Sequence, residues 1–253
     1  MTSQDQTANK RRRASRAAAE PPGAPSEPAG AAAGPPRVRR VSRQREAGEA
    51  TRRETRRRLL AAARAEFADG GYAAATVIRI AERAGVSVQT LYNDCGNKRN
   101  LLRAVMESAV TGDDDAPMVA GQPPAIMTAT LDAVTARDPR RFLAHLSHQY
   151  RLLAERAAVG WQAYRDGAAI DPDITADWQR LSEIRREAFG MMFARFPVRS
   201  LRAGLTRSAA VDTAWAIASP ETHYQLVRQA GYGYDQLEEW VRTTLSAALL
   251  PDQ

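Results

Sequence analysis

The feature that most constrains this chain is the spacing of small and apolar residues between positions 77 and 93. Apolar residues recur at helical spacing in residues 77–84, which predicts a short helix, and Ala81 leaves room for a second helix to approach. Gly85 follows and can adopt the positive φ that a tight turn requires. Residues 88–93 predict another short helix. The spacing therefore predicts two short helices that cross steeply near Ala81.

The second of these helices combines an apolar anchor with a polar outer face. Ser87 can cap its N-terminus, and Val86 and Leu91 can pack against the preceding helix. Four side chains are then left to face outward: Gln89, Thr90, Tyr92 and Asn93. Amide and hydroxyl groups on such a helix can bond base edges and phosphates in a major groove. The alternative is an ordinary helical hairpin whose polar residues only face water.

The remainder of the chain also has helical periodicity. A first helix is expected from about Thr51 to a stop at Asp69-Gly70-Gly71, and a fourth from Lys98 to Gly112. Three later helices are expected to begin with a capping residue followed by proline: Asp138-Pro139, Asp171-Pro172 and Ser219-Pro220. The later helices are expected near residues 124–136, 139–166, 172–196, 207–218, 220–229 and 234–250. The sequence predicts an all-α protein.

The net charge of +7 is unevenly distributed along the chain. Residues 1–50 carry +5 and residues 51–105 carry +6, whereas residues 106–253 carry −4. A basic N-terminal part and a mildly acidic remainder favour a polyanionic partner for the N-terminal part alone. Charge by itself does not distinguish DNA, RNA and an anionic membrane.

Residues 1–48 are expected to form a disordered basic tail rich in proline and alanine, because they offer almost nothing to bury. Two basic clusters lie in it, at residues 10–13 and 37–40. They fit a solvated tail or a flexible arm that adds sequence-independent phosphate contacts. The expected domains are this tail, a helix-turn-helix domain at residues 49–112, and a helical domain at residues 113–253.

Composition disfavours several classes of protein. Cys95 is the single cysteine, which excludes an intrachain disulfide and a cysteine-rich zinc module. No apolar run approaches the roughly 18 residues that span a bilayer, and no secretory signal is recognisable. We expect a soluble, cytoplasmic, nucleoid-associated protein with no membrane partner, metal or cofactor. Ser147-His148 belongs to no nucleophile–base arrangement and no phosphate loop is present, so an enzyme using the helical domain is the least favoured alternative.

A contiguous stretch carries a recognisable pattern: Leu59-Leu60-Ala61-Ala62-Ala63, Phe67, Gly71-Tyr72, Thr76, Ile80-Ala81, Ala84-Gly85-Val86-Ser87, Thr90-Leu91-Tyr92, Asn97-Lys98 and Leu101-Leu102. This stretch, from Arg53 to Val105, resembles the N-terminal domain of the TetR family of bacterial transcriptional regulators. Residues 212–250 resemble more loosely the last two family helices, which pair across a two-fold axis. The middle of the chain matches only in helical character.

The resemblance implies a homodimeric regulator, most often a repressor, that binds a palindromic operator of double-stranded DNA. In the family, a small-molecule effector binds the helical domain and changes the spacing of the two recognition helices. The alternative is a non-specific nucleic-acid or membrane-surface binder that depends on the basic tail.

The resemblance also implies which residues contact DNA. The base readers would be Gln89 and Asn93. Contacts to phosphate or backbone would come from residues that carry a hydroxyl or a positive charge: Thr76, Ser87, Thr90, Tyr92, Lys98, Arg52, Arg53 and Arg56. Ser87 at this position is explained at least as well by capping the helix as by a contact to phosphate.

Two residues depart from the family pattern. Cys95 stands where an aromatic residue is usual, which predicts looser packing between the first and fourth helices. A small buried filler is its favoured role, and a redox-sensing thiol is the alternative. Arg99 stands where an acidic residue is usual, and it lies unfavourably at a helix N-terminus unless it gains a phosphate.

Aromatic and polar residues at helical spacing are the candidates for an effector pocket: His145, His148, Tyr150, Trp161, Tyr164, Trp178, Phe189, Met192 and Phe193. Each also fits simple core packing. His145 and His148 share one face, yet no third and fourth metal ligand is evident. Because few buried cations are implied, an apolar or aromatic effector is favoured over a polyanion.

Overall fold

The computed structural model describes residues 37–115 and 138–251, with side chains from residue 45 onward. The chain divides into two units, residues 1–43 and 44–253. The predicted helix at 124–136 and residues 1–36 of the predicted tail lie outside the described residues. The described part contains helices and no strand, which confirms the all-α prediction.

Four helices form the N-terminal domain: α1 (Arg37–Ala74), α2 (Val77–Ala84), α3 (Val88–Cys95) and α4 (Lys98–Thr111). The bounds of α2 agree with the prediction, and α4 ends beside the predicted Gly112. Helix α1 begins at Arg37, so residues 37–48 of the predicted disordered tail are helical. The sequence did not predict this part of the helix because residues 37–50 carry no apolar periodicity. Helix α1 also continues past the predicted stop, with a kink at Gly71, where φ is 70°.

Local caps fix the ends of the short helices. Side-chain oxygens of Thr76, Ser87 and Asn97 accept backbone N–H groups three residues later, at 3.2, 3.0 and 2.8 Å. Gly85 ends α2 with φ 64°, a left-handed conformation that strongly favours glycine. The predicted turn at Gly85 and cap at Ser87 are therefore confirmed.

The core of the N-terminal domain contains side chains from all four helices. Its completely buried side chains include Leu59, Ile80, Leu91 and Leu101, one from each helix. The buried carboxylate of Glu66 adds polar links from α1 to α2, because it pairs with Arg79 and Arg83 at 3.0 Å each. The apolar side of α3 therefore packs into this core, and its polar side faces away from it.

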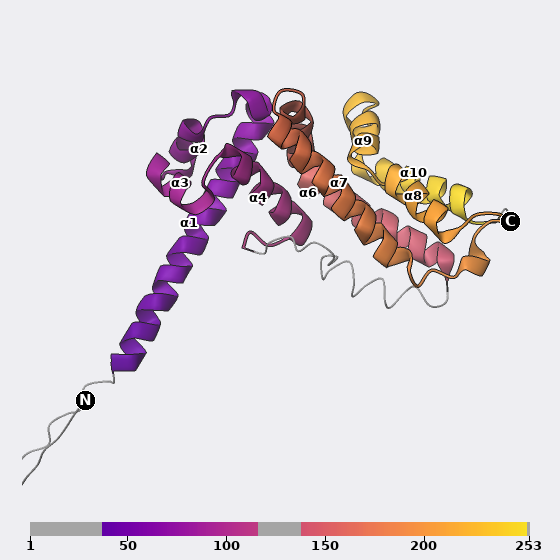
Figure 1. Cartoon of the computed structure of the whole chain (residues 1–253), viewed down its shortest axis with the longest axis horizontal. Coiled ribbons are helices and arrows are strands. Elements are labelled where there is room, and N and C mark those ends of the chain that lie inside the picture. The colour runs from indigo at the N-terminus through magenta and orange to yellow at the C-terminus, as the bar shows by residue number, and fades with distance from the viewer. Residues whose placement is uncertain (1–36, 116–137, 252–253) are drawn as a thin grey trace, which may run out of the picture. The chain divides into compact units, whose positions relative to one another are not determined.

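The larger helical domain contains α6 (Pro139–Ala168), α7 (Pro172–Phe193), η1 (Val198–Ser200), α8 (Arg207–Ile217), α9 (Pro220–His223), the π-helical turn η2 (Tyr224–Gln229) and α10 (Tyr234–Leu249). Helix α6 contacts α4, α7 and α10, and so links the two domains (Figure 1). Asp138, Asp171 and Ser219 cap helices that begin with proline, as predicted. No helix in the described ranges is long and apolar enough to cross a membrane.

Candidate nucleic-acid interface and ligand cavity

Helix α3 presents three polar side chains on one exposed face. Gln89, Tyr92 and Asn93 are exposed, while Leu91 and Cys95 hold the opposite face in the core. Gln89 Nε2 donates to Asn93 Oδ1 at 2.9 Å, so the two amides lie side by side one helical turn apart. The Tyr92 side chain is 46% exposed. The face therefore offers amide donors and acceptors beside a phenol hydroxyl.

Two predicted phosphate contacts have hydroxyls that already cap helices, and the hydroxyl of a third is hydrogen-bonded to one of these caps. Thr76 accepts from the backbone of Arg79, and Ser87 accepts from that of Thr90. The Ser87 and Thr90 hydroxyl oxygens lie 2.8 Å apart. Thr76 and Ser87 are nevertheless exposed, so capping leaves each hydroxyl accessible to a further partner.

Two of the predicted basic contacts have partners inside the protein. Lys98 Nζ donates to the carbonyls of Tyr72 and Ala75 at 2.8 and 3.0 Å, and burial lowers its pKa. Arg56 donates to the Asp114 carbonyl at 2.8 Å. Both side chains therefore stabilise the fold in this structure, whereas Arg52 and Arg53 are exposed on α1.

Arg99 has a protein partner in place of the phosphate considered from the sequence. Its Nε and Nη2 donate to Asp177 of α7 at 2.6 and 2.8 Å, and its Nη1 lies 2.9 Å from Asp173. Arg103 also donates to Asp177, at 2.9 Å. These three bonds to Asp177 join the start of α4 to the helical domain.

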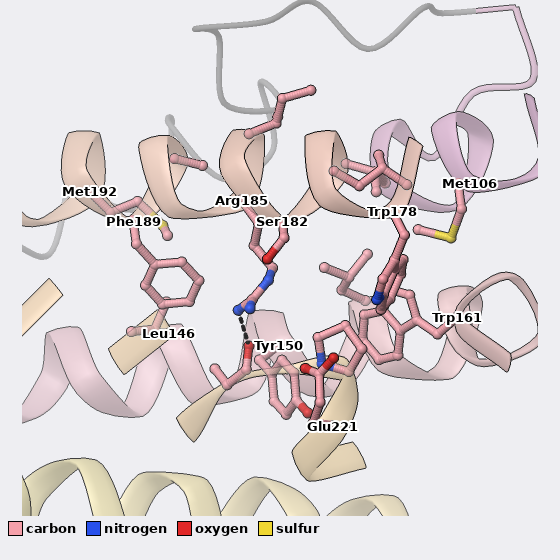
Figure 2. Close-up of a pocket in the computed structure, with 17 residues that line it drawn as sticks. Met106, Leu146, Tyr150, Trp161, Trp178, Ser182, Arg185, Phe189, Met192 and Glu221 are labelled. Atoms are coloured by element: carbon pink, nitrogen blue, oxygen red, sulfur yellow. Dashed lines mark hydrogen bonds between the residues drawn. The ribbon is translucent and has the colours of Figure 1, made fainter. Parts of the chain in front are cut away.

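A cavity of about 110 Å³ lies among α4, α6, α7 and the segment that begins α9 (Figure 2). Five of the predicted pocket residues line it: Tyr150, Trp161, Trp178, Phe189 and Met192. Its walls are otherwise mostly aliphatic. The sequence did not predict the polar and charged lining residues Ser182, Arg185 and Glu221, or Met106, which lies on α4.

The other four predicted pocket residues lie elsewhere. Tyr164 is completely buried and stacks on Trp178 at 5.6 Å between ring centroids. Phe193 packs edge-on to Phe142 at 5.2 Å in the core. His145 is half-buried and lines no part of the cavity, and His148 is exposed beside Glu238, with Nδ1 3.1 Å from a carboxylate oxygen. No set of three or more metal-ligating side chains gathers in the described ranges.

Arg185 is the main polar group that the sequence did not reveal. Its position on α7 shares one face with Trp178, Ser182 and Phe189, which follow the spacing of successive helical turns. Nη1 donates to the carbonyls of Trp215 and Ala218 at 2.5 and 3.0 Å. Burial lowers the pKa of this arginine to about 10.

Cys95 is buried, and its thiol lies 3.2 Å from Asp94 Oδ2. Burial, followed by the hydrogen bond to Asp94, raises its pKa to about 12. A redox-sensing thiol needs a lowered pKa and access to solvent. The structure therefore favours the small buried filler.

We expect Cys95 to react slowly in the folded protein, because its thiol stays protonated at pH 8. Iodoacetamide should alkylate it at least about ten-fold more slowly than in urea, where the pKa returns to about 8.5. Mass spectrometry of timed samples measures both rates. Equal rates would contradict the buried assignment and restore the redox alternative.

Comparisons with known proteins agree with this arrangement. Residues 59–105 match the family model described as "Bacterial regulatory proteins, tetR family". The HTH-type transcriptional activator FasR of Mycolicibacterium smegmatis is 35% identical over 119 residues, which are 46% of this chain and 52% of FasR. The chain thus spans about half the length of this curated relative.

Solved structures share the fold over most of the chain. NalD of Pseudomonas aeruginosa, the secondary repressor of the MexAB-OprM multidrug efflux pump, has a TM-score of 0.59 at 19% identity over 79% of this chain and 98% of NalD. SmeT in complex with triclosan has a TM-score of 0.59 at 21% identity over 78% of this chain and 92% of SmeT. The helix-turn-helix domain thus matches the TetR family of bacterial regulatory proteins over residues 59–105, and most of the chain shares the fold of these solved structures.

Proposed function

We propose that this transcriptional regulator binds a palindromic operator as a homodimer and releases it when a small molecule occupies the cavity. The observation that carries the proposal is the exposed face of α3, where Gln89, Tyr92 and Asn93 project from a helix anchored by Leu91. A helix of this kind can enter a major groove, and a dimer would place two of them about one duplex turn apart, ~34–36 Å. The sign of regulation then depends on where the operator lies relative to the promoter.

The cavity supports the second half of the proposal, because its wall includes Met106 of the linking helix α4. A Cβ added to Gly160 of α6 would lie only 2.4 Å from Met106 Sδ, so the two helices approach closely there. A ligand that displaces Met106 therefore changes how α4 packs on α6. The ligand would bind more tightly to the protein with the changed α4–α6 packing than to the protein that binds the operator. This difference in affinity would drive release of the operator.

The dimer is proposed through α8 and α10, the helices that resemble the pairing helices of the family. They contact each other in this structure and carry the half-buried Trp215 and Trp240. Sedimentation equilibrium should give twice the chain mass. A monomer that still binds a palindromic site would contradict this part of the proposal.

The variant Tyr92→Phe should lower operator affinity about 10- to 100-fold, since a hydrogen bond to a charged phosphate contributes about 1.5–3 kcal/mol. The exposed hydroxyl is not needed by the fold, so thermal unfolding should not change. Fluorescence anisotropy with labelled operator measures the affinity, and Tyr232→Phe in the helical domain is the control. Unchanged operator affinity in Tyr92→Phe would remove this residue from the interface.

Footprinting of the full chain on the DNA upstream of its own gene tests the proposed function directly. Protection should cover two half-sites and should weaken steeply as salt rises, because phosphate contacts release counterions. The protein should also select sites from random genomic fragments. Absence of protection at low salt in both experiments would overturn the proposal. Binding without sequence preference that is lost on deletion of residues 1–48 would favour the tail-driven alternative.

A further inference from the structure

The cavity combines an apolar wall with a single guanidinium. Most lining residues are aliphatic or aromatic, and Arg185 enters from α7 between them (Figure 2). Among the described residues that line the wall, Glu221 alone carries a carboxylate, and its charge partly offsets the effect of burial on the pKa of Arg185. A cation in such surroundings is costly unless hydrogen bonds or an anion compensate for lost water.

Compensation for the Arg185 cation is incomplete. Both of its hydrogen bonds to described residues come from Nη1, so the N–H groups of Nε and Nη2 remain for another partner. Aromatic faces provide part of the missing solvation, with the rings of Trp215 and Phe189 at 4.8 and 5.9 Å. The free edge of the fork is the edge that binds carboxylates in a bidentate manner.

A second donor lies near the first. Ser182 also lines the cavity and precedes Arg185 by three residues on the same face of α7. The Tyr150 hydroxyl, in contrast, donates to the Ser219 carbonyl at 2.7 Å, so its hydrogen is already committed. Arg185 and Ser182 thus favour a ligand with hydrogen-bond acceptors on the α7 side of the cavity, whereas Glu221 is an acceptor on the side of α9.

We propose that the effector is a small carboxylic acid, with its carboxylate on Arg185 and its apolar body against the aromatic wall. This inference rests on the proposed function, and it changes the expectation of an apolar or aromatic effector by adding an anionic group. A cavity of about 110 Å³ is smaller than the ~150 Å³ that holds benzene in an engineered core. Even a single ring with its carboxylate must therefore displace a flexible side chain such as Met106 or Met192.

The test compares acids with their uncharged isosteres on the full wild-type chain. The panel contains benzoate, 4-chlorobenzoate, hexanoate and octanoate, each beside its own primary amide, and isothermal titration calorimetry measures each Kd. At least one acid should bind about ten-fold or more tightly than its amide. If no acid in the panel binds more tightly than its amide, the proposal is wrong.

Variants of Arg185 test whether a preference for the acid over its amide depends on the guanidinium. Arg185→Gln should remove the preference for the acid, and Arg185→Lys should reduce it without abolishing it. The matched control is Arg186→Gln, because Arg186 is the adjacent residue but is exposed and pairs with Asp212 at 2.7 Å. Glu221→Gln should tighten acid binding several-fold by removing a nearby negative charge. An acid preference that survives in folded Arg185→Gln would overturn the assignment.

Operator binding by the same samples separates this inference from the proposed function. A protein that binds its operator but shows no acid preference would leave the regulator intact and refute the carboxylate site. If the protein prefers the acid through Arg185 but binds no operator, the carboxylate site stands and the proposed regulatory function is wrong.

Discussion

Replacing Leu91 with alanine is expected to abolish operator binding by loosening α3, without removing any group that touches DNA. Leu91 is completely buried and is the apolar anchor of the recognition helix. Truncating a buried leucine costs about 2–5 kcal/mol of the free energy of unfolding, part of it from the cavity that remains. For a domain of this size, that loss is a large part of the total stability.

Two optical probes can locate this damage. The four tryptophans, at residues 161, 178, 215 and 240, all lie in the helical domain, whereas far-ultraviolet circular dichroism reports on every helix. In Leu91→Ala, the dichroism should show an early partial transition during urea unfolding, while tryptophan fluorescence changes near the wild-type midpoint. Coincident transitions would mean that the domains unfold as one unit.

The matched control for Leu91→Ala lies on the outer face of the same helix. Gln89→Ala and Asn93→Ala should change the free energy of unfolding by no more than about 0.5 kcal/mol, because both residues are exposed. Each should still reduce the preference for operator over random DNA, since a bidentate base contact gives about 1–3 kcal/mol of discrimination. Loss of stability in these controls would show that the amide pair serves the fold.

Features of the helix-turn-helix could be predicted because they are local. A turn that needs positive φ requires a residue such as Gly85, and an N-cap such as Ser87 acts on a backbone N–H three residues away. The same holds for Asp138 before Pro139. Signals of this kind depend on neighbouring residues alone, so a sequence displays them directly.

Roles that depend on tertiary partners could not be predicted in this way. Lys98 and Arg56 look like phosphate ligands in sequence, yet carbonyls far along the chain accept their hydrogen bonds. Helical spacing marked both Trp178 and Phe193 as buried aromatics, but it cannot distinguish a cavity wall from a core. The sequence alone suggests a surface position for Arg185, because its hydrogen-bond partners lie about thirty residues away, in α8 and just after it.

The link between Asp177 and the start of α4 leads to the second large effect. We expect Asp177→Asn to lower the thermal midpoint at pH 7 by about 2–4 °C or more, because Arg99 and Arg103 lose a shared carboxylate. The control is Asp212→Asn on α8. This change breaks an exposed ion pair with Arg186, which lies on α7 like Asp177. Such exposed pairs contribute little, so this control should unfold close to the wild type.

The pH dependence gives this prediction a definite sign. The hydrogen bond from Arg99, followed by that from Arg103, holds the pKa of Asp177 below its usual value. The stabilisation is therefore present above about pH 4, the ordinary aspartate pKa, and disappears as the pH falls through the lower folded value. The difference in midpoint between wild type and Asp177→Asn should be full at pH 6–7 and should narrow below pH 4. A difference independent of pH would show that the carboxylate charge is not involved.

Asp177 also bears on how occupancy of the cavity reaches DNA. Trp178, the next residue, lines the cavity, so a ligand that shifts this turn of α7 would also shift the carboxylate that pairs with α4. In Asp177→Asn, the tightest-binding acid of the panel should still bind the cavity, but the ratio of operator Kd with and without it should fall toward one. Calorimetry measures the first quantity and anisotropy the second. An unchanged ratio would place the coupling elsewhere, with Met106 and Val110 of α4 the remaining lining residues from the helix-turn-helix domain.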